Sequence, residues 1–291
     1  MIADFEYFAP KTLNEALSLL DEYRDDCKVI AGGQSMLVLM RQGLVSPENV
    51  IDIKGISELD FIKMESDKGL RIGALTTHRT IEKSSVITNG FNVLAEMERR
   101  LASIQTRNWG TIGGNLCHGD PAGDPAPILM ALNATLVINC MDNVRSIPIE
   151  DFYLDYLETA LESNELLTEI QISGLLSHTG TSYSKFNIID SDMGIVGVAV
   201  SITLNSNSGI CNDARIALGA AAPTPVRAKQ AEDVLKGKKI TEKLLKEAGQ
   251  IASNESEPIS DISATEEYRR ELIKIMVARV GNEAFARAKN T

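Results

Sequence analysis

The first 55 residues carry a hydrophobic pattern that predicts a small α/β unit. Thr12 and Glu15 have the spacing of a capping box, which predicts the start of a helix. Apolar runs at residues 28–31 and 50–53 predict strands, and residues 34–40 predict a short helix. The apolar face of the first helix recurs at i, i+3, i+4 and i+7 and consists of Leu13, Ala16, Leu17 and Leu20. A unit of this size is too small for a complete doubly wound domain.

Residues 56–176 form a larger unit with mixed elements. A boundary is predicted at residues 173–181, which are rich in Ser, Gly and Thr. The helix that starts at Pro125 has proline in its first turn, where proline is tolerated. The hydrophobic pattern of this unit predicts strands at residues 70–74, 135–139 and 166–172 and helices at residues 91–104 and 125–132.

Residues 177–291 place their strands before their helices, which is an α+β order. Because no helix separates the strands, they predict a three-stranded antiparallel sheet. The helices that follow predict a small bundle. The predicted strands are residues 183–187, 196–204 and 214–220, and the predicted helices are residues 226–236, 242–252 and 266–288.

Composition narrows the class of protein. The net charge of −11 argues against a nucleic-acid partner, because such binding depends on clustered Lys and Arg. No apolar run approaches the roughly 20 residues of a membrane span, and residues 1–6 do not resemble a secretory signal. The four cysteines include no Cys-x-x-Cys pair, which argues against a metal centre in this chain. Their wide spacing predicts reduced thiols in a cytoplasmic protein.

Two glycine-rich loops carry the strongest chemical signal. The first is Ala31-Gly32-Gly33-Gln34-Ser35, and the second is Thr111-Ile112-Gly113-Gly114-Asn115. Neither is a Rossmann fingerprint or a P-loop. Glycine lets backbone N–H groups approach an anion closely, so two such loops indicate one ligand with a diphosphate. The prediction is a dinucleotide such as FAD.

Several segments together resemble one family, the FAD-binding medium subunits of molybdenum-containing hydroxylases, which include carbon monoxide dehydrogenase and xanthine dehydrogenase. The resemblance implies a two-part FAD-binding domain of the vanillyl-alcohol-oxidase-like type, formed by residues 1–55 and 56–176, and a C-terminal α+β domain at 177–291. The segments that carry the resemblance are residues 31–35, 72–78, 107–114, 120–124, 214–220 and 222–228.

The resemblance also implies the cofactor site. Residues 31–35 would wrap the diphosphate, and residues 111–115 would hold it from the other side. Asp124 would accept hydrogen bonds from FAD hydroxyls, and Lys185 would contact the adenine or the flavin edge. No catalytic residue and no metal ligand is predicted, since the chemistry is that of FAD. The full predicted set is Ile30, Ala31, Gly32, Gly33, Gln34, Ser35, Met36, Leu101, Ala102, Thr111, Ile112, Gly113, Gly114, Asn115, His118, Gly123, Asp124 and Lys185.

The implied function is electron transfer within a larger complex. A large subunit would carry the molybdopterin cofactor and a small subunit would carry two [2Fe–2S] clusters, with two heterotrimers forming a dimer. The FAD of this chain would pass electrons to NAD, a quinone, oxygen or another acceptor. A free-standing FAD-dependent oxidoreductase and a non-catalytic FAD-binding scaffold are the alternatives. The resemblance implies that the substrate binds to a different subunit, so this sequence does not identify it.

Overall fold

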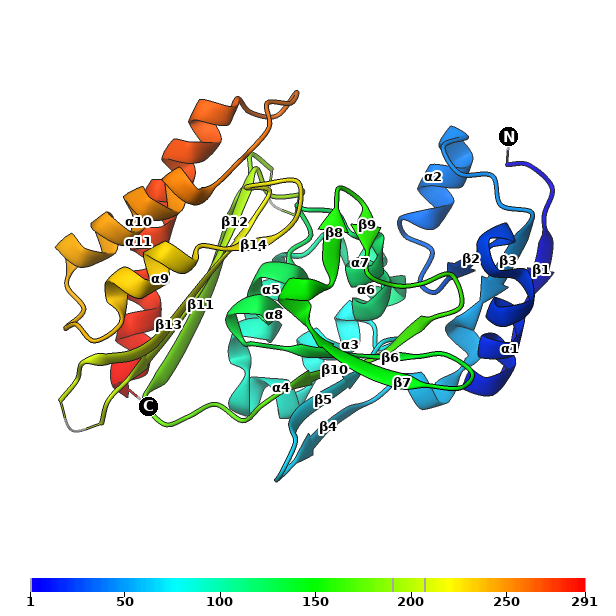
Figure 1. Ribbon diagram of the computed structural model, residues 1–291, viewed down its shortest axis with the longest axis horizontal. Helices are drawn as coiled ribbons and strands as arrows, with labels where there is room; N and C mark the ends of the chain where they lie inside the picture. The colour runs from blue at the N-terminus through cyan, green and yellow to red at the C-terminus, as the bar shows by residue number, and fades with distance from the viewer. Residues whose placement is uncertain (1, 190, 207, 291) are drawn as a thin grey trace.

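The computed structural model describes residues 2–189, 191–206 and 208–290. The chain folds into three units that lie in a row, each built around its own sheet. The N-terminal unit lies at one end of the long axis, coloured blue in Figure 1, and the C-terminal helices lie at the other end, in orange and red. The largest unit lies between them. Within the described ranges, no helix is long and apolar enough to cross a membrane.

The N-terminal unit is a parallel sheet in the order β1-β3-β2, covered by a helix. Its strands are β1 (Glu6–Phe8), β2 (Cys27–Ile30) and β3 (Asn49–Asp52), and its helices are α1 (Leu13–Tyr23) and α2 (Met36–Gln42). Thr12 accepts a hydrogen bond from the Glu15 N–H, as the capping pattern predicts. The Glu15 carboxylate accepts instead from the Lys11 N–H. The predicted apolar face of α1 is buried against the sheet.

The central unit is a five-stranded antiparallel sheet with a layer of short helices. The strand order is β4-β5-β10-β6-β7, from β4 (Ile62–Glu65), β5 (Gly69–Gly73), β6 (Thr135–Asn139), β7 (Val144–Pro148) and β10 (Leu166–Ile172). A small hairpin, β8 (Tyr153–Asp155) and β9 (Glu158–Thr159), follows β7. The helices are α3 (His78–Lys83), α4 (Ser85–Gly90), α5 (Asn92–Arg100), α6 (Ile104–Trp109), α7 (Ile112–His118) and α8 (Pro125–Ala131).

The C-terminal unit is a four-stranded antiparallel sheet packed between two helical layers. The strands are β11 (Thr179–Phe186), β12 (Val196–Leu204), β13 (Cys211–Gly219) and β14 (Val226–Arg227). One face meets α9 (Lys229–Leu235), α10 (Glu242–Glu255) and α11 (Glu266–Asn290), as Figure 1 shows. The other face meets α5 and α8 of the central unit. That face carries the small residues Ala199 and Ala217, which join the central core.

The coarse prediction of a mixed α and β chain with antiparallel C-terminal strands is confirmed, and several details were wrong. The strand predicted at residues 183–187 begins already at Thr179, inside the predicted boundary at 173–181. The helix predicted at residues 91–104 ends at Arg100, where the chain turns before α6 begins. The second glycine-rich loop is largely the helix α7. The C-terminal sheet has a fourth strand, because residues 226–227 pair with β13 and the helix begins only at Lys229.

Close packing of β11 on α11 gives a test of this arrangement. A Cβ on Gly180 would lie 2.1 Å from the Ala284 carbonyl oxygen. We expect Gly180→Ala to lower the free energy of unfolding by about 3 kcal/mol, the upper end of the cost of overpacking. Gly174→Ala is the control, because nothing lies within 4 Å of its Cβ position. Equal stability of the two variants in urea unfolding would contradict the packing.

Candidate functional site

The first glycine-rich segment is in direct contact with the backbone just before the second segment. A Cβ on Gly32 would lie 2.0 Å from the carbonyl oxygen of Trp109 and 2.7 Å from the Cα of Gly110. No side chain fits in that space, so packing of protein against protein requires this glycine, whatever the ligand. The contact joins the N-terminal unit to the helical layer of the central unit.

The first segment presents a row of backbone N–H groups. Gly33 has a left-handed φ of 71°, and the chain turns there just before α2 begins. Among the described residues, no backbone or side-chain acceptor receives a hydrogen bond from the backbone N–H groups of residues 32–36. Successive N–H groups in such a turn form a nest that binds an anion. The segment is therefore suited to the predicted diphosphate.

The second segment differs because its first N–H groups already have protein acceptors. The chain that follows β5 runs beside the start of α7 and forms an isolated β-bridge with it. The carbonyl groups of that chain therefore accept hydrogen bonds from the second segment. Ile112 donates to the Thr76 carbonyl (3.0 Å), Gly113 to the Ala74 carbonyl (2.9 Å) and Gly114 to Thr111 Oγ1 (3.1 Å). The second segment thus contributes shape and side chains, and the first contributes free donors. The segment 72–78 therefore holds the second segment in position by accepting these backbone hydrogen bonds.

The two glycines of the second segment have different surroundings. Gly113 is buried, and its Cβ would lie 2.6 Å from the Cβ of Ala74. Gly114 is exposed, and its Cβ would lie 2.8 Å from Thr111 Oγ1 and 3.8 Å from the Cβ of Ala31. The open side of Gly114 therefore faces the first segment. A side chain there would fill the space between the two segments.

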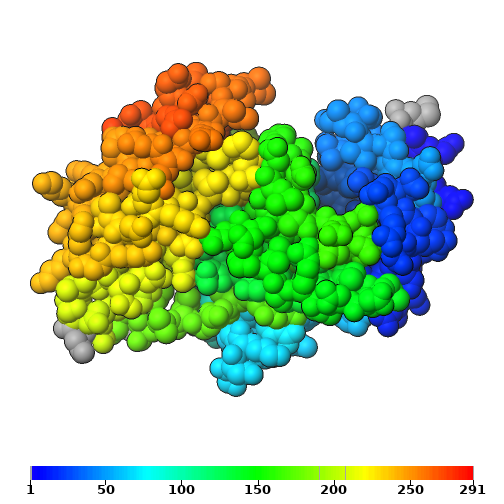
Figure 2. All heavy atoms as spheres, in the orientation of Figure 1, coloured from blue at the N-terminus to red at the C-terminus, as the bar shows by residue number. Residues whose placement is uncertain are grey.

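A hollow in the surface runs beside this contact. Figure 2 shows the surface recessed between α2, in blue, and the β8–β9 hairpin, in green. The hairpin leans on the end of α7, where a Cβ on Gly119 would lie 3.2 Å from the Leu157 Cα. The two glycine-rich segments and the hairpin thus border this hollow.

Asp124 and Lys185 form a buried ion pair at the far end of this region. Lys185 Nζ lies 2.7 Å from Asp124 Oδ2, and the Tyr183 hydroxyl donates to Asp124 Oδ1 over 2.6 Å. Burial and the charge of Asp124 raise the pKa of Tyr183 well above its ordinary value. Each oxygen of Asp124 keeps a second lone pair, so the carboxylate can still accept from ligand hydroxyls. The predicted residues Asp124 and Lys185 therefore belong to one unit.

Leu101 and Ala102 form the turn between α5 and α6, and Arg107 holds it. The Arg107 guanidinium donates to the carbonyls of Leu101 (2.6 Å) and Ala102 (2.7 Å) and to Glu82 Oε2 (3.1 Å). Ala102 has a φ of 43°, a left-handed conformation that costs about 1–3 kcal/mol and needs such support. Sequence reasoning missed Arg107, Tyr183 and Glu82, although Arg107 stands inside the recognised motif.

The remaining predicted residues lie around these features. Ile30 ends β2 and Met36 begins α2, on either side of the first segment. His118 is the half-buried last residue of α7. Gly123 precedes Asp124, and its Cβ would lie 3.2 Å from Asn115 Oδ1. These positions follow the path from the first segment to the Asp124–Lys185 pair.

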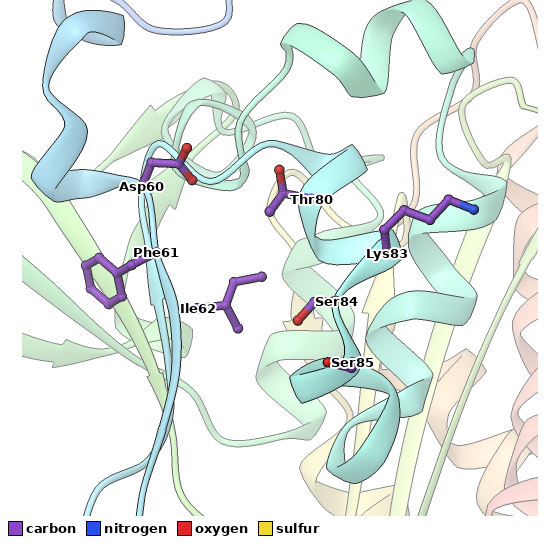
Figure 3. A pocket seen from close by; sticks show the side chains of 7 residues that line it. All are labelled: Asp60, Phe61, Ile62, Thr80, Lys83, Ser84 and Ser85. Carbon is purple, nitrogen blue, oxygen red and sulfur yellow. The ribbon is translucent and has the colours of Figure 1, made fainter.

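A separate hollow lies outside this path, whereas Cys117 lies within α7. A separate open hollow of about 560 Å³ lies between β4 and the helices α3 and α4 (Figure 3), and it contains none of the predicted residues. Its lining residues are Asp60, Phe61, Ile62, Thr80, Lys83, Ser84 and Ser85. Burial raises the pKa of the Cys117 thiol to about 12, so little reactive thiolate exists at neutral pH.

These features are suited to a class of protein that binds an extended diphosphate ligand. Residues 3–173 match the model of the FAD-binding domain in molybdopterin dehydrogenase, and residues 181–284 match the C-terminal domain of CO dehydrogenase flavoprotein. The chain belongs to this family. It is an oxidoreductase subunit that carries FAD and transfers electrons through it.

The similarity covers nearly the whole chain. The carbon monoxide dehydrogenase medium chain of Hydrogenophaga pseudoflava is 34% identical over 97% of this chain and 98% of its own length. The glyceraldehyde dehydrogenase medium chain of Sulfolobus acidocaldarius is 32% identical over 96% of this chain and 98% of its own length. A solved structure of carbon monoxide dehydrogenase from Hydrogenophaga pseudoflava superposes with a TM-score of 0.95 at 36% identity, covering 99% of each chain.

Gly114 provides a test of the site that separates binding from folding. We expect Gly114→Ala to lose FAD, because the added methyl group enters the space between the two segments. Stability without FAD should change little, since the gain in helix propensity of about 1 kcal/mol offsets a weakened Thr111 cap. Absorbance gives the flavin content, and thermal unfolding gives the stability. Full flavin content would contradict the assignment of this surface.

The buried ion pair makes a second prediction. Lys185→Met leaves Asp124 charged and unpaired, and we expect the free energy of unfolding to fall by about 3–5 kcal/mol. Adding Asp124→Asn should restore much of that loss, because no uncompensated charge then remains buried. The exposed pair Lys246–Glu242 is the control, and Lys246→Met should change stability little. Urea unfolding measures all three variants, and additive losses in the double variant would argue against the pairing.

Proposed function

We propose that this chain is the electron-output subunit of a molybdenum hydroxylase. A large subunit would hold the molybdopterin cofactor, and a small subunit would hold two [2Fe–2S] clusters. The observation that carries the proposed site is the row of N–H groups at residues 32–36 beside the open face of Gly114. Bound there, FAD would supply the two-electron chemistry.

The roles of individual residues follow from their contacts. The N–H groups of residues 32–36 would bind the diphosphate, with Ser35 adding a hydroxyl donor. Asp124, held by Lys185 and Tyr183, would accept hydrogen bonds from sugar or ribityl hydroxyls. Leu101 and Ala102, fixed by Arg107, would form a wall of the pocket. None of these groups needs to form a bond to a substrate.

Exposed apolar side chains at the hollow support a partner subunit at its rim. α2 carries Leu37, Val38 and the following Leu44, with exposures of 36–69%. Trp109 is 56% exposed beside the first glycine segment, and Leu154 and Tyr156 are exposed on the opposite hairpin. Aromatic and apolar surface of this kind is typical of a protein interface. We infer that the small iron–sulfur subunit covers this rim.

We further propose that the partner, and not this chain, selects the substrate. The relatives named above belong to a carbon monoxide dehydrogenase and a glyceraldehyde dehydrogenase. Carbon monoxide and glyceraldehyde differ greatly in size and polarity. Their medium chains are nevertheless about equally similar to this one. We also propose that two heterotrimers form a dimer and that the complex lies in the cytoplasm.

Removing the flavin from the intact complex tests the division of labour. With Gly114→Ala in the complex, substrate should still bleach the iron–sulfur clusters, while reduction of the external acceptor should fall to the level of the clusters alone. Stopped-flow spectroscopy separates the two steps, because clusters and flavin absorb differently. Gly174→Ala is the control. If the chain purified with FAD but without molybdenum or iron, a free-standing flavoenzyme or a scaffold would replace this proposal.

A further inference from the structure

One face of α3 carries two buried polar side chains that contact the neighbouring helices α5 and α6. His78 opens α3 and Glu82 lies one turn later, so the two side chains share a face of the helix. Glu82 accepts a hydrogen bond from Arg107, which holds the turn between α5 and α6. His78 makes two further contacts, one to the Glu98 carboxylate and one to the backbone of Gly110.

His78 joins the last turn of α5 to the residue that follows α6. His78 Nδ1 lies 3.0 Å from each carboxylate oxygen of Glu98, and the two side chains are 3% and 0% exposed. The His78 N–H donates to the Gly110 carbonyl over 3.0 Å, and a Cβ on Gly110 would lie 3.1 Å from the imidazole Cδ2. The imidazole ring therefore packs against Gly110, and Glu98 fixes the orientation of the ring.

Gly110 is in contact with the first glycine-rich segment as well as with the imidazole. A Cβ on Gly32 would lie 2.7 Å from the Gly110 Cα. The Glu98 carbonyl accepts from the Leu101 N–H over 3.2 Å. The His78–Glu98 pair thus connects two parts of the proposed FAD site, the turn at Leu101 and the backbone against which Gly32 packs. Because protein interiors are close-packed, a displaced imidazole would also displace the Gly110 backbone.

We propose that His78 and Glu98 are positioning residues of the FAD site, which hold the Gly110 backbone and through it the N–H groups of residues 32–36. Both side chains are buried, so they act on the cofactor through Gly110 and not by contact with it. The inference rests on the proposed function, because it requires the flavin to occupy this cleft. With the pair intact, the first segment is preorganised, and FAD does not have to order it on binding.

The single tryptophan of the chain provides a direct readout. Trp109 immediately precedes Gly110 and is 56% exposed, so its fluorescence anisotropy reports on the mobility of this backbone. Glu98→Leu removes the hydrogen-bond partner of the imidazole and keeps an apolar side chain at a fully buried position. In the FAD-free full chain, we expect this variant to lower the anisotropy of Trp109. We expect the Kd for FAD to rise about tenfold, the low end of what the loss of an orienting hydrogen-bond partner costs at metal sites.

Two conservative variants separate the hydrogen bond from the ring contact. Glu98→Gln retains an oxygen that accepts from the imidazole, so it should keep the anisotropy and the Kd of the unmodified chain. His78→Gln retains a hydrogen-bonding group for Glu98 but removes the ring that packs against Gly110. It should therefore show the same losses as Glu98→Leu, and it supplies the measurement if Glu98→Leu does not fold.

Glu232→Leu is the matched control, because Glu232 is a similarly buried carboxylate that is paired with Arg227 in the C-terminal unit. It should lower stability to urea while the Kd for FAD and the anisotropy of Trp109 stay unchanged, which separates positioning from a general loss of stability. A folded His78→Gln protein with the unmodified Kd, or equal losses in Glu98→Gln and Glu98→Leu, would overturn this inference alone. An unmodified chain that binds no FAD would overturn the proposed site together with it.

Discussion

The contact between Gly32 and the backbone of Trp109 and Gly110 is the constraint on which the rest of the site depends. It packs the loop after a parallel strand against the end of the helix α6 of a different unit, with no space for a side chain. The free N–H groups of residues 32–36 stand beside the open face of Gly114 because of this contact. The chain after β5 holds the other side in place through hydrogen bonds from Ile112 and Gly113. A cleft for an extended anion thus results from close packing between units, before any ligand binds.

Buried charge is the second organising feature, and it is arranged in pairs. Arg107 with Glu82 fixes the left-handed turn at Ala102, and Lys185 with Asp124 joins β11 to the start of α8. A buried charge without a partner costs several kcal/mol, so each pair ties two elements that are distant in sequence. These pairs orient the surfaces that flank the cleft. A site for a diphosphate needs no cluster of Lys or Arg when backbone N–H groups supply the donors, which reconciles the acidic chain with an anionic ligand.

The sequence predicted several of the strands and helices, missed others such as β4, β7, α3 and α4, and gave little information on long-range contacts. The strands at residues 135–139, 166–172 and 196–204 were predicted at their observed ends, because their residues are mainly apolar and β-branched. The helix end at Arg100 was missed, because the turn that follows it is held by hydrogen bonds from Arg107 to two backbone carbonyls and has no strong local signal. Both glycine-rich segments were found, yet the reason for Gly32 was not, because its neighbour lies far along the chain. The pairing of Asp124 with Lys185 spans 61 positions and has no local signature.

The character of the site also explains how one subunit can serve different enzymes. Its features are backbone donors, a glycine that keeps a cleft open and a buried pair that positions a carboxylate. In the proposed assignment, all of them address parts of a dinucleotide that do not change from one enzyme to another. Nothing in them depends on the shape of an oxidised substrate, so a change of substrate places no demand on these residues. What such a change would alter is the energy of the electrons that arrive.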